Sequence, residues 1–76
     1  MNSIGIIAGG GKLPIAIGKN LIKKNFNICF LVIEEFFNTK NYKDFDVEII
    51  NLKSAKNIIN SLKSRNIDSI IMAGNI

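Results

Sequence analysis

Consecutive glycines near the start of the chain are the residues best placed to do chemistry. Residues 9–11 are all glycine; they follow an apolar run at residues 4–8, and Lys12 and Pro14 come just after them. This order predicts a turn at the carboxyl end of a buried strand, with a helix beginning beyond it. Backbone N–H groups at such a turn can face an anion, and the helix dipole favours negative charge there. Because glycine has no Cβ, the backbone can approach a phosphate closely. The pattern therefore predicts a phosphorylated ligand without saying which one.

The P-loop of ATP- and GTP-hydrolysing proteins does not fit this stretch. A P-loop carries a glycine five residues before the glycine of its Gly-Lys pair, and a serine or threonine after the lysine. Here Ile6 and Leu13 take those two positions. Because the hydroxyl that binds magnesium is missing, we do not expect a P-loop nucleotide hydrolase.

The dinucleotide-binding fingerprint fits in part. It places Gly-x-Gly-x-x-Gly between a strand and a helix. The glycine run supplies the first two glycines, while Pro14 stands at the third position. An acid, Glu34 or Glu35, also follows the second expected strand, where a ribose-binding carboxylate would sit. A nucleotide-type ligand and a purely structural tight turn are both open at this point.

Strands and helices are expected to alternate along the chain. The expected strands cover residues 3–8, 28–33, 47–52 and 67–73, and the expected helices cover residues 14–24 and 54–66. Residues 34–46 form a polar, aromatic-rich connection, and residues 74–76 begin a further turn. Pro14 suits the first position of a helix, and Gly18 permits close packing of that helix on a strand. Ser54 would cap the second helix through its hydroxyl.

The second expected helix has one apolar face. Ala55, Ile58, Ile59 and Leu62 fall at spacings of three and four residues, which places them on the same side of a helix. This pattern predicts that Ile59 belongs to the core.

The alternation predicts an α/β fold, a Rossmann-like three-layer open parallel sheet with two main helices. Right-handed crossovers favour the strand order 3-2-1-4. Residues 1–76 would then be one amino-terminal domain of a longer protein. In this order the fourth strand lies beside the first, so the loop after Ala73 and Gly74 opens on the same edge as the glycine turn.

Composition narrows the chemistry further. The single cysteine, Cys29, lies in an apolar run, and the chain has no histidine, which excludes disulfide frameworks, Cys/His metal sites and histidine-based triads in this segment. The carboxylates form no pattern typical of a metal site. The net charge of +4 comes from dispersed lysines, and most phenylalanines suit a core, so we expect no nucleic-acid partner. An attraction to anionic lipid headgroups fits the charge.

Two segments together resemble one enzyme family. Residues 7–14, Ile-Ala-Gly-Gly-Gly-Lys-Leu-Pro, resemble the I-A-G-G-G-x-L-P opening of the LpxI-type UDP-2,3-diacylglucosamine pyrophosphatases. Residues 70–76, Ile-Ile-Met-Ala-Gly-Asn-Ile, resemble that family's later strand, which ends in Ala-Gly. The resemblance covers essentially the whole chain, but only the family's amino-terminal domain. The chain departs from the family near the second helix, where Lys53 and Lys56 stand in place of a frequent glycine.

The resemblance implies a hydrolase of lipid A biosynthesis in Gram-negative bacteria. Such enzymes cleave the pyrophosphate of UDP-2,3-diacylglucosamine to UMP and 2,3-diacylglucosamine 1-phosphate, in the cytoplasm and peripheral to the inner membrane. Their divalent-metal centre, of the magnesium type, lies mainly in the carboxyl-terminal domain, so neither catalytic residues nor metal ligands are expected in this segment. The implied partners are the nucleotide-sugar lipid, the carboxyl-terminal domain and the inner-membrane surface.

Two loops carry the substrate-binding residues that we expect. They are Gly9, Gly10, Gly11, Lys12 and Leu13 in the first loop, and Ala73 and Gly74 in the second. The three glycines would offer backbone N–H groups to phosphate or sugar oxygens, and Lys12 would add a positive charge. Leu13 and Pro14 would pack and begin the helix.

Two other functions fit the same residues. The chain could be half of an NAD-type dinucleotide-binding domain of an oxidoreductase, with Glu34 and the glycine loop carrying the cofactor. It could also be a small non-enzymatic α/β interaction module whose glycine loop is only a turn.

Overall fold

The structure, a computed structural model, describes residues 3–75. Part of the expected turn at residues 74–76 therefore falls outside the described residues. The elements in chain order are β1 (Ser3–Ala8), α1 (Leu13–Lys23), β2 (Asn27–Ile33), a 3₁₀ turn (Glu34–Phe36), α2 (Thr39–Tyr42), β3 (Val47–Ile50), α3 (Ala55–Ser64) and β4 (Ser69–Ala73).

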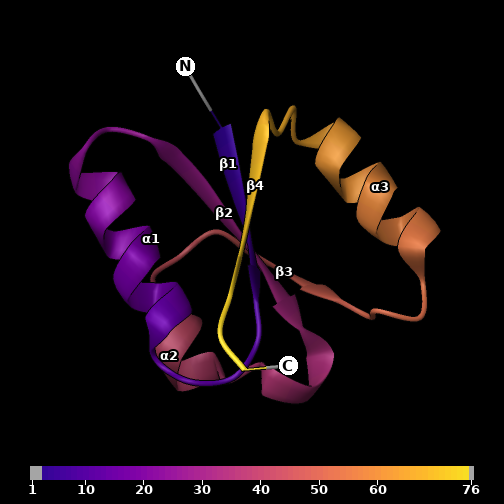
Figure 1. Cartoon of the computed structure of the whole chain (residues 1–76), viewed down its shortest axis with the longest axis horizontal. Coiled ribbons are helices and arrows are strands. Elements are labelled where there is room, and N and C mark those ends of the chain that lie inside the picture. The colour runs from indigo at the N-terminus through magenta and orange to yellow at the C-terminus, as the bar shows by residue number, and fades with distance from the viewer. Residues whose placement is uncertain (1–2, 76) are drawn as a thin grey trace.

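The four strands form one parallel sheet in the order β3-β2-β1-β4, which confirms the predicted α/β fold and strand order. β1 is central: its residues from Ser3 to Ala8 pair with β2, and those from Ile4 to Ala8 pair with β4. Helices α1 and α2 lie on one side of the sheet and α3 lies on the other, giving three layers (Figure 1). Because all four strands run the same way, their carboxyl ends meet at one edge.

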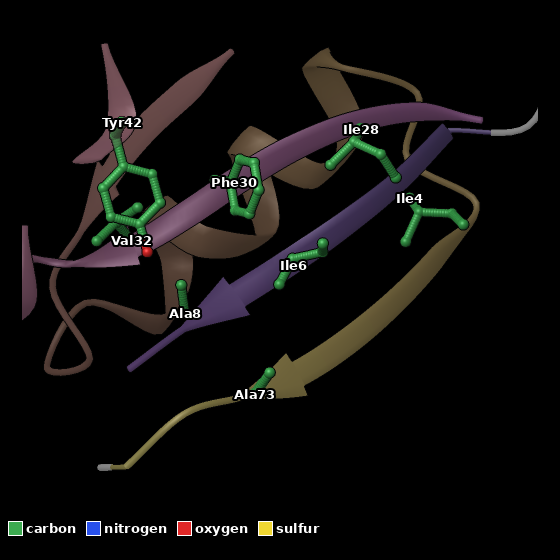
Figure 2. Close-up of a cluster of buried hydrophobic side chains, with 8 residues drawn as sticks. All are labelled: Ile4, Ile6, Ala8, Ile28, Phe30, Val32, Tyr42 and Ala73. Atoms are coloured by element: carbon green, nitrogen blue, oxygen red, sulfur yellow. The ribbon is translucent and has the colours of Figure 1, made fainter. Parts of the chain in front are cut away.

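The core on the α1 side is built around Phe30 in β2. Its ring is fully buried, and the rings of Tyr42 and Phe45 meet it edge to face at centroid distances of 5.4 Å and 5.2 Å. Figure 2 shows Phe30 and Tyr42 over β2, with Ile6 beside them on β1. The predicted role of Gly18 is confirmed here, because a Cβ at that position would overlap Cζ of Phe30 and lie 2.9 Å from its Cε1.

The core on the α3 side is smaller. Cys29 and Leu31 are buried in it, so the lone cysteine serves as a small apolar core residue. Ile58 and Leu62 of α3 pack against this cluster, but no side chain of α3 is buried. The prediction that Ile59 is a core residue was wrong, since half of its surface (50%) is exposed. The spacing identified the apolar side of α3 correctly, but α3 contacts the sheet along a narrower stripe than the spacing predicts.

Several boundaries also differ from expectation. The connection at 34–46 contains α2, whose first turn is capped because the side chain of Asn38 accepts hydrogen bonds from the backbone N–H groups of Lys40 and Asn41. Strand β3 ends at Ile50 rather than at residue 52, since the chain turns there. Ser54 does precede α3, but its hydroxyl makes no capping hydrogen bond, which corrects that prediction.

Candidate functional site

The glycine turn after β1 and the end of β4 are joined by backbone hydrogen bonds. The N–H of Gly9 donates to the carbonyl of Ala73 over 2.9 Å, and the N–H of Gly10 donates to the carbonyl of Asn75 over 2.7 Å. The N–H of Asn75 donates back to the carbonyl of Gly10 over 3.0 Å. The two loops that the sequence places at one edge are therefore joined at the carboxyl end of the sheet (Figure 1).

Gly74 is the residue that makes this junction possible. Its φ angle is +92°, a conformation that residues with side chains rarely adopt. A Cβ at this position would lie 2.7 Å from the carbonyl oxygen of Gly10 and 3.0 Å from Cγ of Pro14. No other residue type fits there without separating the loops.

The hydrogen bonds correct one part of the expected chemistry. The N–H groups of Gly9 and Gly10 donate to the carbonyls of Ala73 and Asn75, so these two glycines shape the turn and do not present donors to a ligand. Within residues 3–75, the backbone N–H groups of Gly11, Lys12 and Leu13 have no acceptor. The donors open to an anion thus begin two residues later than predicted, at the first turn of α1.

The first turn of α1 is exposed and positively biased. Lys12 precedes the helix, its side chain makes no capping bond, and no acidic residue lies in the first turn. Pro14 is fully buried, as expected for a residue that packs and begins the helix. Leu13 does not pack: 58% of its surface is exposed, which corrects that expectation and leaves an apolar side chain facing solvent beside the open donors.

Phe36 is a residue of this edge that the sequence reasoning did not identify. A Cβ on Gly10 would lie 3.0 Å from Cδ1 of Phe36, so the ring covers the outer side of the glycine turn. The available signal was an aromatic residue placed directly after the end of the second strand, at the same edge of the sheet. Phe36 brings the loop after β2 into contact with the turn after β1.

Titratable groups elsewhere serve the fold. Burial raises the pKa of the Cys29 thiol from 9.0 to about 11, with smaller effects from nearby charges. Arg65 donates to Asp46 over 2.7 Å and to Glu48 over 3.2 Å, and the hydrogen bond to Asp46 raises the pKa of the guanidinium. These pairs tie the end of α3 to the strand β3.

The described part of the chain offers no set of residues that fits the metal implied by the family resemblance. No three carboxylates or thiols gather within residues 3–75 in an arrangement that could hold an ion. In that same part, every helix is too short or too polar to span a bilayer.

The fold and the joined loops define an α/β domain with an open parallel sheet. In open parallel sheets, ligands bind outside the carboxyl ends of the strands where the strand order reverses, and that point lies here between β1 and β4. The sequence matches the family model of the LpxI N-terminal domain over residues 3–76, and the chain belongs to the LpxI family. It is accordingly the amino-terminal domain of an enzyme of lipid A biosynthesis. A comparison with curated proteins gives no match.

Proposed function

We propose that this chain is the substrate-contacting domain of an enzyme that hydrolyses the pyrophosphate of UDP-2,3-diacylglucosamine, releasing UMP and 2,3-diacylglucosamine 1-phosphate. The observation that carries the proposal is the family match over residues 3–76, together with the junction between the glycine turn and the end of β4. These are the same two segments whose sequences resemble the pyrophosphatases.

The proposed role of the first turn of α1 is to bind phosphate oxygens. The backbone N–H groups of Gly11, Lys12 and Leu13 have no acceptor within the described residues, and the helix dipole favours an anion at that end. The side chain of Lys12 adds a positive charge that is not paired in the described part of the chain. Gly9 and Gly74 hold the turn in the shape that exposes these donors.

The proposed partners are the nucleotide-sugar lipid, the carboxyl-terminal domain of the enzyme and the surface of the inner membrane. A divalent metal in the carboxyl-terminal domain would neutralise phosphate charge and activate water. Residues 3–75 supply no ligand set for it, so this chain's own contribution is to bind and orient the substrate.

A ligand comparison tests this function against the two alternatives. Equilibrium binding of UDP-2,3-diacylglucosamine in detergent micelles, of NAD and of micelles alone is measured on the chain. The proposal predicts saturable binding of the lipid substrate and none of NAD. Preference for NAD would favour a dinucleotide-binding domain, and binding of neither would favour an interaction module.

A second measurement concerns catalysis. Because residues 3–75 gather no set of metal ligands, we expect no release of UMP from the substrate by the chain alone, with or without magnesium. Metal-dependent release of UMP above the level of a Gly10→Val control would contradict the proposal that this chain only binds the substrate while the carboxyl-terminal domain catalyses its hydrolysis.

A further inference from the structure

A basic cleft lies between α1 and α2, beside the glycine loop. It encloses about 510 Å³, and its lining includes Lys12 and Lys19 from the α1 segment and Lys40 from α2. Figure 1 shows α2 against the end of α1 that follows the glycine turn. The volume lies within the range of roughly 300–1,000 Å³ that is typical of small-molecule sites.

The charges around the cleft are unequal. Lys12, Lys19 and Lys40 face a single acid, Asp44, among its lining residues. A hollow on the opposite face of the sheet, between β3 and α3, is lined instead by Glu34 and Glu48 and by no lysine or arginine. The residues that line this cleft therefore carry an excess of positive charge, whereas those that line the hollow beside β3 and α3 do not.

The cleft also has an apolar floor. Ile15 and Phe45 line it, and both are half-buried because they pack against the core around Phe30. Lys12 and Lys19 are seven residues apart, so they lie on one face of α1 about 10 Å apart along its axis. A ligand lying there would meet ammonium groups at its rim and hydrocarbon at its base.

We infer that this cleft binds an organic phosphate, with the phosphate among Lys12, Lys19 and Lys40 and an attached apolar group on Ile15 and Phe45. This site is separate from the donors at the first turn of α1, although Lys12 borders both. The inference goes beyond the proposed function, because it requires only a phosphate ester with an apolar substituent. Such a group could come from a soluble metabolite or from a phospholipid headgroup.

The experiment measures binding of butyl phosphate and of inorganic phosphate to the chain by amide NMR titration at constant ionic strength. The cleft predicts saturable shifts at residues of α1 and α2, and tighter binding of butyl phosphate, by about fivefold or more, because its alkyl group covers apolar surface. Equal affinity for the two probes would overturn the role of the apolar floor. Absence of saturable shifts there would overturn the site.

Matched variants separate the cleft from general charge. Lys19→Gln with Lys40→Gln removes two cleft lysines, and Lys53→Gln with Lys56→Gln removes the same charge near α3. We expect the first pair to weaken butyl phosphate binding about five- to tenfold and the second less than about twofold, since exposed ion pairs act locally. Asp44→Asn should strengthen binding. Equal losses in both pairs, or weaker binding by Asp44→Asn, would contradict the inference.

A vesicle experiment shows whether the phosphate belongs to a lipid headgroup or to a soluble ester. Sedimentation with phosphatidylcholine vesicles, with or without phosphatidylglycerol, is compared for the wild type and both pairs. Loss of phosphatidylglycerol-dependent binding only in Lys19→Gln with Lys40→Gln would assign a lipid headgroup; unchanged sedimentation alongside lost butyl phosphate binding would assign a soluble ester. Substrate binding at the glycine loop is tested separately with a Gly11 variant. A failure of the proposed function can therefore be distinguished from a failure of the inferred cleft site.

Discussion

Gly18 in α1 allows the sharpest test of how closely this helix approaches the sheet. An alanine Cβ at position 18 would overlap Cζ of Phe30 and lie 2.9 Å and 3.2 Å from the two Cε atoms of that ring. The ring has no room to withdraw, because it is fully buried and held edge-on by Tyr42 and Phe45. Gly18→Ala must therefore displace the helix or distort the aromatic cluster.

Two opposing effects decide the sign of this substitution. In a helix interior alanine is favoured over glycine by about 1 kcal/mol. Overpacking a core costs about 1–3 kcal/mol, and an overlap with several ring atoms belongs at the upper end. We therefore expect Gly18→Ala to lower the free energy of unfolding by about 1–2 kcal/mol. A domain of this length has a total stability of about 4–11 kcal/mol, so the loss is readily measured.

Urea unfolding followed by far-ultraviolet circular dichroism measures the effect. Asn20→Ala is the matched control: it is an exposed position of the same helix, and it should raise stability by a few tenths of a kcal/mol, about the difference in helix propensity. In a Phe30→Leu background the clash is relieved, so Gly18→Ala should no longer destabilise. If Gly18→Ala is as stable as the wild type or more stable, α1 does not sit on Phe30 as described.

Three further predictions concern the rest of the fold. Calorimetry should show that Ile6→Ala costs about 2–5 kcal/mol because its side chain is fully buried, whereas Ile59→Ala costs less than about 1 kcal/mol; similar losses would mean that α3 packs more tightly than described. Arg65→Gln should lower stability by about 0.5–1 kcal/mol in low salt and by less in 1 M sodium chloride; a salt-independent loss would show that ion pairing is not its role. Since burial raises the pKa of Cys29 to about 11, folding opposes its ionisation, so stability should fall as the pH rises from 9.0 towards 11. Over this pH range the urea midpoint of Cys29→Ala should fall less than that of the wild type. Identical falls in the two proteins would contradict the prediction.

Much of the architecture could be predicted from local patterns. Apolar runs marked the strands, and the preference for right-handed crossovers then determined the order β3-β2-β1-β4. The same reasoning placed Gly74 beside the glycine turn, and the structure joins those segments by hydrogen bonds. Glycine within a helical pattern correctly indicated the close approach of Gly18 to Phe30.

Other features depend on contacts that no local pattern contains. The helix period identified the apolar side of α3, but how deeply Ile59 is buried depends on how the whole helix lies against the sheet. The hydrogen bonds that commit the amides of Gly9 and Gly10 are made to residues more than sixty positions away, so a glycine motif alone overstated the donors available. The capped turn at α2 was detectable from Asn38, yet its packing of Tyr42 on Phe30 was not.

Contact between the turn at Gly11 and the substrate is tested most directly by one comparison of binding affinities. In a complete LpxI protein carrying this domain, the dissociation constant for UDP-2,3-diacylglucosamine and the free energy of unfolding are measured for Gly11→Val and Asn25→Val. Both residues have positive φ, +93° and +68°, so valine strains the backbone at each, by about 1–3 kcal/mol, but Asn25 lies at the opposite edge of the sheet. A Cβ at Gly11 would have no neighbouring atom within 4 Å, so a side chain there does not disturb packing inside the protein. We expect at least about tenfold weaker substrate binding for Gly11→Val and unchanged binding for Asn25→Val. Equal affinity in the two variants would contradict this expectation.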